Sequence, residues 1–251
     1  MSDSERRVIW ITGASMGIGA AVARRAAREG WIVAISARSR DKLSELEAEH
    51  DAIHAYPLDV LDRDENASVL DRIEKDLGPV DTVVLNAGTH AEMAADEFDS
   101  AAAARVFDLN LTGLANGIEP VLKRFLGRGH GRLALTASVA GYRGLPRAAA
   151  YCASKAGVIA MAESLAAEIG HRGVRVQVIC PGFVRTPLTD KNDFPMPYLM
   201  EPDDAAERVI QGLKSDRFEI AFPRRFVWQL KLLRLLPAGL YFRLIRKATG
   251  H

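Results

Sequence analysis

The sequence predicts one α/β domain of the doubly wound type, with a parallel sheet covered by helices on both faces. Short runs rich in β-branched residues alternate with longer segments of helical periodicity. The chain has 251 residues, of which 48% are apolar and 26% charged, as in ordinary globular proteins. We expect a single domain over residues 1–222, extended by a C-terminal segment over residues 223–251.

Seven short runs have the composition of strands and are separated by helical patterns. The predicted strands are 8–11, 32–35, 53–56, 80–85, 132–136, 174–179 and 218–221. The predicted helices are 20–28, 63–77, 113–126, 153–169 and 203–213. This alternation is typical of βαβ units, in which consecutive strands are parallel. Residues 187–200 contain Pro and Met without a clear period, which favours a loop over a site.

Charge and cysteine content exclude several classes of protein. The formal net charge is +1, so the chain has no global basic field for nucleic acid. Cys152 and Cys180 are too few for a disulfide framework, which favours a reducing compartment. We expect a cytoplasmic protein, because the polar N-terminus does not resemble a secretory signal and no apolar run is long enough to cross a bilayer.

No metal site is expected. His50 and His54 are four residues apart, a spacing that can suit a metal on a helix. The residues between them are predicted to join the end of a helix to the start of a strand, so the two rings are not expected to share a helix face.

The C-terminal segment differs from the rest of the chain in charge. Residues 223–251 carry seven cations and no Asp or Glu: Arg224, Arg225, Lys231, Arg234, Arg243, Arg246 and Lys247. Two apolar runs on either side of Pro237 predict two short helices. Two interpretations stay open: the helices lie on an anionic membrane, or they cover apolar surface of the domain or of a neighbouring subunit.

A glycine-rich turn follows the first predicted strand. Gly13, Gly17 and Gly19 let the backbone approach a pyrophosphate, and the N-terminus of the next helix supplies free N–H groups. The spacing is G-x3-G-x-G. Gly13, Ser15 and Gly17 also match the nucleophile elbow of α/β hydrolases, with Ser15 as the nucleophile. That fold needs a loop after an earlier strand for its oxyanion hole, and only one strand precedes this turn.

The residue that would bind the adenosine ribose is basic. About twenty residues after Gly19, where NAD enzymes place an acid, the chain reads Ser36 to Arg40 without any acid. Arg38 can pair with a ribose 2′-phosphate through its planar guanidinium, which favours NADP over NAD. The alternative is a solvated arginine at the end of a strand.

Tyr151 and Lys155 are one helical turn apart on one face. Using a tyrosine as a base near neutral pH requires its pKa to fall by roughly 2 to 3 units, or about 3 to 4 kcal/mol. An ammonium about 4 Å away supplies roughly 4 kcal/mol at an effective dielectric constant near 20. One lysine is therefore sufficient, although the same spacing also occurs on ordinary amphipathic helices.

These features together resemble the short-chain dehydrogenase/reductase family over about residues 8–221. The resemblance depends on the glycine turn, Asn86-Ala87-Gly88, the separate residues Asn110 and Ser138, the pair Tyr151 and Lys155, and the stretch from Pro181-Gly182 to Thr186. It implies a Rossmann-type domain, a nicotinamide cofactor and a homodimer or homotetramer. The residues that match the family's cofactor site are Gly13, Ser15, Gly17, Ile18, Gly19, Arg38, Asp59, Val60, Asn86, Ala87, Gly88, Tyr151, Lys155, Pro181, Gly182 and Thr186.

The resemblance also implies four catalytic roles. Tyr151 would exchange a proton with the substrate oxygen while hydride moves to or from the nicotinamide, and Ser138 would orient that oxygen. Lys155 would bind the nicotinamide ribose and lower the pKa of Tyr151, and the backbone of Asn110 would hold a water in a proton relay. Met16 stands where many NADP-preferring relatives have a basic residue, so the expected NADP preference depends on Arg38.

The segments that line the substrate pocket in this family are mostly apolar here, which predicts a lipophilic alcohol or ketone. They contribute Tyr142, Leu145, Phe183, Leu188, Phe194, Met196, Tyr198, Leu199 and Met200. A second class of function stays open, a dinucleotide-binding sensor or regulator that does not catalyse and whose basic tail contacts a membrane or partner.

Overall fold

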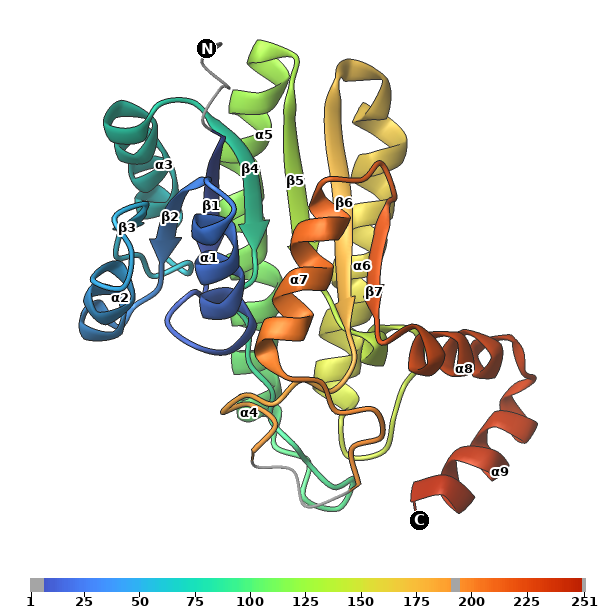
Figure 1. The fold of residues 1–251 in the computed structure, drawn as a ribbon. Coiled ribbons are helices and arrows are strands. Elements are labelled where there is room, and N and C mark those ends of the chain that lie inside the picture. Colours follow the sequence, from blue (N-terminus) through green and yellow to red (C-terminus); the bar gives the residue numbers. More distant parts are fainter. Residues whose placement is uncertain (1–6, 191–194, 250–251) are drawn as a thin grey trace.

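The computed structural model describes residues 7–190 and 195–249, and its centre is a seven-stranded sheet (Figure 1). The strands follow the order β3-β2-β1-β4-β5-β6-β7, and every neighbouring pair is parallel. Their bounds are β1 Val8–Thr12, β2 Ile32–Ser36, β3 Ile53–Ala55, β4 Val80–Leu85, β5 Gly131–Thr136, β6 Val174–Pro181 and β7 Glu219–Phe222. The predicted fold class, with β7 as the last strand, is confirmed.

Helices cover both faces of the sheet. One face packs against α1 (Gly17–Arg28), α2 (Arg40–Glu47) and α7 (Pro202–Leu213). The opposite face packs against α3 (Arg63–Leu77), α5 (Gly113–Arg128) and α6 (Ala149–Ile169). The shorter elements are α4 (Ser100–Phe107), a π-turn η1 (Asp108–Thr112) and the 3-10 turns η2 (Val139–Gly141) and η3 (Gly170–Arg172).

The bounds of α3 agree with the prediction because both ends carry local signals. The Asp62 carboxylate caps the first turn by accepting a hydrogen bond from the Glu65 backbone N–H at 2.9 Å. Gly78, at a φ of 95°, ends the helix. Val69 and Ile73 are one turn apart and are buried against the sheet.

Two helices, α2 and α4, were not predicted. α2 has eight residues and buries only Leu43 and Leu46, so its apolar pattern is too short to show a period. α4 is rich in alanine, which carries little contrast between polar and apolar faces. The helices α1 and α6 begin three and four residues earlier than predicted, because their first turns lack apolar periodicity.

The strand order reverses between β1 and β4, and this switch point positions the site. The buried Thr12 joins the two strand ends. Its hydroxyl accepts hydrogen bonds from the backbone N–H groups of Asn86, at 3.0 Å, and Ala87, at 3.4 Å. The glycine turn after β1 and the segment after β4 are therefore held side by side.

The C-terminal segment forms the two predicted helices, α8 (Arg224–Leu235) and α9 (Ala238–Thr249). They project from the domain beside the edge strand β7 (Figure 1). Val227 of α8 and Tyr241 of α9 are buried, and the Tyr241 hydroxyl donates to the Gly144 carbonyl at 2.5 Å. Within residues 7–190 and 195–249, no helix is both long and apolar enough to span a bilayer.

Candidate active site

A cleft of about 640 Å³ opens at the carboxyl ends of the strands, at the switch point. It gathers most of the residues that the sequence singles out. The predicted residues that line it are Gly13, Ser15, Gly17, Ile18, Arg38, Asp59, Val60, Asn86, Ala87, Gly88, Ser138, Tyr151, Lys155, Pro181, Gly182 and Thr186. The other two, Gly19 and Asn110, are buried and contact residues of the lining.

The turn after β1 requires glycine at position 13. Its φ is +66°, and a Cβ atom there would lie 2.6 Å from the backbone Cα of Ala87. A side chain would therefore separate the turn from the end of β4. The side-chain amide of Asn86, which follows β4, donates to the Gly13 carbonyl at 3.2 Å and so fixes the turn against the end of β4.

The start of α1 suits an anion such as a pyrophosphate. Met16 at the N-cap makes no side-chain capping bond, and the first turn contains no acidic residue. The first N–H groups of the helix therefore keep their partial positive charge. In the same cleft the Thr136 hydroxyl is buried and has no hydrogen-bond partner among the described residues. Both observations fit a dinucleotide with its phosphates at α1.

Lys155 is the most deeply buried charged group of the cleft, with an exposed fraction of 4%. Its ammonium donates to the Thr136 carbonyl at 2.9 Å. A Cβ on Gly88 would lie 3.3 Å from Nζ, so Gly88 leaves room for the lysine head. Burial lowers the pKa of Lys155 from 10.5 to about 8.

Tyr151 lies one turn before Lys155 on α6, as the spacing predicts. Burial raises the pKa of the Tyr151 phenol, and a hydrogen bond with the Ser138 hydroxyl opposes this shift. In this structure the net shift of the Tyr151 pKa is upward, and the predicted lowering by Lys155 stays a prediction. The ammonium lies 5.9 Å from the centre of the tyrosine ring and binds the Thr136 carbonyl, so its effect on the phenol does not offset burial.

Asn110 lies in the π-turn η1, where the insertion of a residue shifts the helical register. Its side chain forms two hydrogen bonds with the backbone of Thr89, accepting at 2.8 Å and donating at 2.9 Å. It also donates to the Ser154 hydroxyl at 2.9 Å. Asn110 therefore ties the segment after Gly88 to α6.

The sequence reasoning missed His90, whose ring meets the Tyr151 ring edge-on at a centroid distance of 4.7 Å. Burial lowers the pKa of His90, which keeps the imidazole neutral at neutral pH. Thr89 and Ser154 were also missed. The only available signal was proximity in the chain, since they adjoin Gly88 and Lys155.

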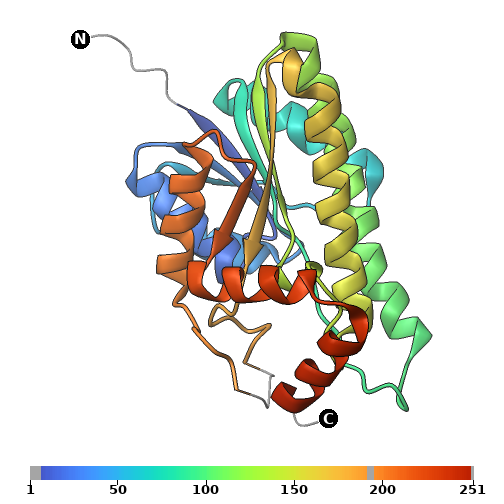
Figure 2. The same ribbon diagram turned by 90° about the vertical axis from the view of Figure 1, so that its right-hand side faces the viewer.

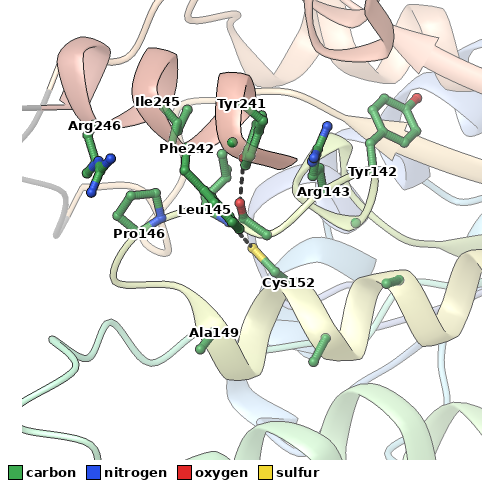
Figure 3. Close-up of a pocket in the computed structure, with 15 residues that line it drawn as sticks. Tyr142, Arg143, Leu145, Pro146, Ala149, Cys152, Tyr241, Phe242, Ile245 and Arg246 are labelled. Carbon is green, nitrogen blue, oxygen red and sulfur yellow. Dashed lines mark hydrogen bonds between the residues drawn. The ribbon is translucent and has the colours of Figure 1, made fainter. Parts of the chain in front are cut away.

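The predicted substrate-pocket residues fall into separate groups. Leu188 lines the cleft, whereas Tyr142 and Leu145 line a second groove beside α9 (Figure 3). The Tyr142 hydroxyl donates to the Glu219 carboxylate at 2.6 Å, which directs it away from the cleft. Phe183 and Tyr198 pack against α8. Phe194 lies outside the described residues.

Within the described ranges, no three His, Cys, Asp or Glu side chains are grouped as metal ligands. His50 and His54 lie on opposite sides of the turn before β3. The Nδ1 atom of His50 accepts a hydrogen bond from the Ala52 backbone at 3.1 Å.

Comparison with known proteins assigns the family. The model of the short chain dehydrogenase family matches residues 7–195. An oxidoreductase of Myxococcus xanthus is 35% identical over 245 residues, which are 96% of this chain and 97% of that protein. The chain belongs to the short-chain dehydrogenase/reductase family.

Other relatives have named reactions. A 3-oxoacyl-(acyl-carrier-protein) reductase of Thermotoga maritima is 32% identical and covers 85% of each chain. Among solved structures, the actinorhodin polyketide ketoreductase with NADPH is 29% identical, with a TM-score of 0.79, covering 88% of this chain and 97% of that one. The protein is thus an oxidoreductase that uses a nicotinamide dinucleotide and acts on an alcohol or a carbonyl.

Proposed function

We propose that the protein is an NADP(H)-dependent oxidoreductase that interconverts a lipophilic alcohol and its carbonyl form, with Tyr151 as the general acid and base. One observation carries the proposal. A single cleft has Ser138, Tyr151 and Lys155 at one end and the glycine turn with Arg38 at the other.

Different residues of the cleft would bind different parts of the dinucleotide. The turn with Gly13, Ser15, Gly17, Ile18 and Gly19 would hold the pyrophosphate, and Asp59 and Val60 would lie beside the adenine. The nicotinamide end would contact Asn86, Ala87, Gly88, Pro181, Gly182 and Thr186. When bound, the nicotinamide supplies or accepts the hydride and, in its oxidised form, a positive charge that favours tyrosinate.

Four residues of the protein would take part in substrate orientation and proton transfer. Tyr151 donates a proton to the carbonyl oxygen in reduction and accepts it in oxidation. Ser138 hydrogen-bonds the same oxygen and orients the substrate. Lys155 would bind the nicotinamide ribose, and the Asn110 backbone would hold the water of a proton relay.

The raised pKa of Tyr151 supports reduction at neutral pH. Burial keeps the phenol protonated, and the protonated phenol is the form that donates to a carbonyl oxygen. The test of the function is reduced-cofactor consumption, followed by absorbance, across a panel of carbonyls. Turnover with any carbonyl supports the proposal. Cofactor binding without turnover on a broad panel would favour the alternative of a sensor.

Arg38 supports NADP over NAD. Its side chain is exposed in the lining of the cleft, with Ser39 beside it. We expect NADPH to bind at least about tenfold more tightly than NADH, a difference of roughly 1.4 kcal/mol. Arg38→Asp should abolish this preference, because the aspartate would repel a 2′-phosphate and accept hydrogen bonds from a ribose hydroxyl.

The matched control is Arg40→Asp, which makes the same charge change two residues further on, outside the lining. It should leave the preference within about twofold, which is under 0.5 kcal/mol. Equal affinities for the two cofactors in the unchanged protein, or equal effects of the two substitutions, would contradict the role of Arg38. A 38% identical relative from Sphingomonas is named as an NAD(+) enzyme, so the family itself does not decide the cofactor.

The apolar side chains near the chemical end support a lipophilic substrate. Leu109, Val184 and Leu188 line the cleft. The relatives from Thermotoga maritima and the actinorhodin pathway are named as reductases of 3-oxoacyl and polyketide groups. In the panel we expect higher kcat/KM for long-chain or cyclic ketones than for polar sugars. A preference for sugars would contradict this part of the proposal.

We also propose a cytoplasmic homodimer or homotetramer that contacts a membrane peripherally through residues 223–251. Ala153, Ala156 and Ala160 of α6 are exposed, the first two in the groove beside α9, and their small side chains favour close helix packing between subunits. Sedimentation velocity at micromolar concentration tests the assembly, and a monomer would contradict it.

A further inference from the structure

The C-terminal helices leave an apolar surface uncovered although they are docked on the domain. Six large apolar side chains on α8 and α9 are exposed: Trp228, Leu232, Leu235, Leu240, Phe242 and Leu244. They make up half of the twelve exposed large hydrophobic residues described in the chain. Solvent-exposed apolar side chains that are concentrated in this way mark an interaction site.

The exposed side chains follow helical spacing. Trp228, Leu232 and Leu235 are related by i, i+4 and i+7, so they share one face of α8, with exposed fractions of 66%, 62% and 80%. Leu240 and Leu244 share a face of α9. We call five of these apolar residues, all except Phe242, which lines a groove facing α6, together with the exposed cations of α8 and α9, the tail surface.

Six cations of the tail surface have no acidic partner among residues 7–190 and 195–249. They are Arg224, Arg225, Arg234, Arg243, Arg246 and Lys247, all exposed. The ion pairs found among the described residues include only one tail cation, Lys231, which pairs with Glu219 of β7. The tail surface therefore combines apolar side chains with unneutralised positive charge.

The helices themselves are firmly attached. Arg143 donates to the carbonyl oxygens at the end of α8, those of Leu233, Arg234 and Leu236, at 2.8 to 3.0 Å. The same guanidinium lies over the Tyr241 ring, 3.9 Å from its centre. The tail surface thus belongs to an ordered element, in which the inner residues are docked and the outer ones face solvent.

α8 packs on the core of the domain through Val227, whereas α9 covers its neighbours incompletely. Beside the Tyr241 contact, a groove of about 820 Å³ separates α9 from the start of α6 (Figure 3). Phe242 and Ile245 line this groove on the α9 side, and Leu145 and Pro146 line it on the other. The apolar side chains on the two sides of the groove are therefore not packed against each other along its whole length.

We infer that the tail surface binds an anionic lipid bilayer, with Trp228 and the exposed leucines inserted at the interface. Helices that carry Lys and Arg beside Trp, Phe and Leu bind in this way, through buried apolar area and attraction to anionic headgroups. A second copy of the chain is a poorer occupant. A two-fold contact would place this cationic surface against itself without acidic residues to neutralise it.

The inner side of α8 connects the tail surface to the cleft. The Phe226 ring stacks on Phe183 at 5.6 Å and contacts Tyr198 at 6.0 Å between centroids. The Gln229 amide donates to the Tyr198 hydroxyl at 3.2 Å. Phe183 and Tyr198 belong to the segment between β6 and α7 that also borders the cleft. These contacts therefore link the tail surface to the segment that borders the cleft.

Trp228 provides a direct test of the insertion. The other two tryptophans, Trp10 and Trp31, have exposed fractions of 0% and 5%, so a change in emission on binding reports Trp228. The full chain is mixed with phosphatidylcholine vesicles, with or without about one third phosphatidylglycerol, and binding is measured by sedimentation. We expect at least about tenfold tighter binding to the anionic vesicles, with a blue shift of the tryptophan emission. The shift should be absent in Trp228→Phe, which should still bind.

Two sets of variants separate the electrostatic contribution to vesicle binding from the contribution of the inserted apolar side chains. Arg243→Glu with Lys247→Glu should weaken binding to anionic vesicles at least tenfold, since each cation contributes about 1 kcal/mol. The matched control reverses Lys75 and Arg208, two exposed cations on α3 and α7, and should bind within about threefold of the unchanged protein. Leu232→Ser with Leu235→Ser should weaken binding without changing the net charge.

Several results would overturn the inference. They are absence of binding to anionic vesicles, equal loss in the tail variant and its control, and binding without any shift of Trp228 emission. A smaller oligomer in Leu232→Ser with Leu235→Ser, without vesicle binding by the unchanged protein, would identify the tail surface as a contact between copies. The assay contains no substrate or cofactor, so its outcome is independent of the proposed reductase activity.

Discussion

Among single residues, Lys155 has the clearest dependence on pH. Its folded pKa is about 8, against 10.5 as its ordinary value. Below pH 8 the folded and unfolded chains both carry the proton, and the full cost of burying the charge opposes folding. Between pH 8 and 10.5 only the unfolded chain keeps it, so this cost falls as the pH rises.

Comparison with Lys155→Met isolates this effect. We expect the free energy of unfolding of the unchanged protein, relative to the variant, to rise by up to about 3 kcal/mol between pH 8 and 10.5. Urea unfolding at several pH values measures it. A difference that stays constant over this range would show that Lys155 keeps an ordinary pKa in the fold.

Many of the residues that line the cleft could be predicted from the sequence, but their electrostatics could not. Spacing correctly predicted that Tyr151 and Lys155 share a face of α6. It gave no information on the Thr136 carbonyl, which comes from β5 and binds the ammonium. The burial that raises the pKa of Tyr151 also depends on the packing of distant segments, among them the one that carries His90.

At the scale of elements, the turn between β1 and α1 has a matched pair of glycines for testing. Gly13 and Gly30 both have positive φ, +66° and +83°. A Cβ on Gly13 would meet the Ala87 backbone at 2.6 Å, whereas nothing lies within 4 Å of one on Gly30. Gly30→Ala should cost roughly 1 to 2 kcal/mol of stability from backbone strain alone. Gly13→Ala should cost about 1 to 3 kcal/mol more and abolish dinucleotide binding.

Urea unfolding and cofactor titration on both variants measure the difference. Equal losses of stability, with cofactor binding retained in Gly13→Ala, would mean that the contact with Ala87 does not shape the site.

Elements with local signals were predictable and those without them were not. α3 has a capping aspartate, a terminal glycine and a clear apolar period, and β4 is a short run that ends in three apolar residues, so both agree with their predicted bounds. α4 has a capping aspartate, Asp99, but its alanine-rich sequence shows no apolar period, and the π-turn η1 lacks a side-chain cap as well. η1 nevertheless directs the Asn110 side chain to Thr89, so part of the site depends on an element that the sequence did not predict.

For the whole molecule, the parallel sheet brings the segments that follow β1 to β6 to one cleft, while α8 and α9 extend from the edge strand β7. Figure 2 shows α8 crossing in front of the sheet and α9 turning away from it. The alternation of strands and helices predicted the sheet. It could not predict how the tail would dock, because that depends on Arg143 and Tyr241, which meet only in the folded chain.

The central claim is that Tyr151 transfers the proton in a reaction dependent on NADP(H), and Tyr151→Phe tests it most directly. The substitution removes one hydroxyl and keeps the ring against His90. We expect the variant to bind NADPH within about threefold of the unchanged protein, a difference of about 0.6 kcal/mol. Its turnover of the best carbonyl in the panel should fall by about 10²- to 10⁴-fold. Turnover that persists in Tyr151→Phe, with NADPH still bound, would contradict the account.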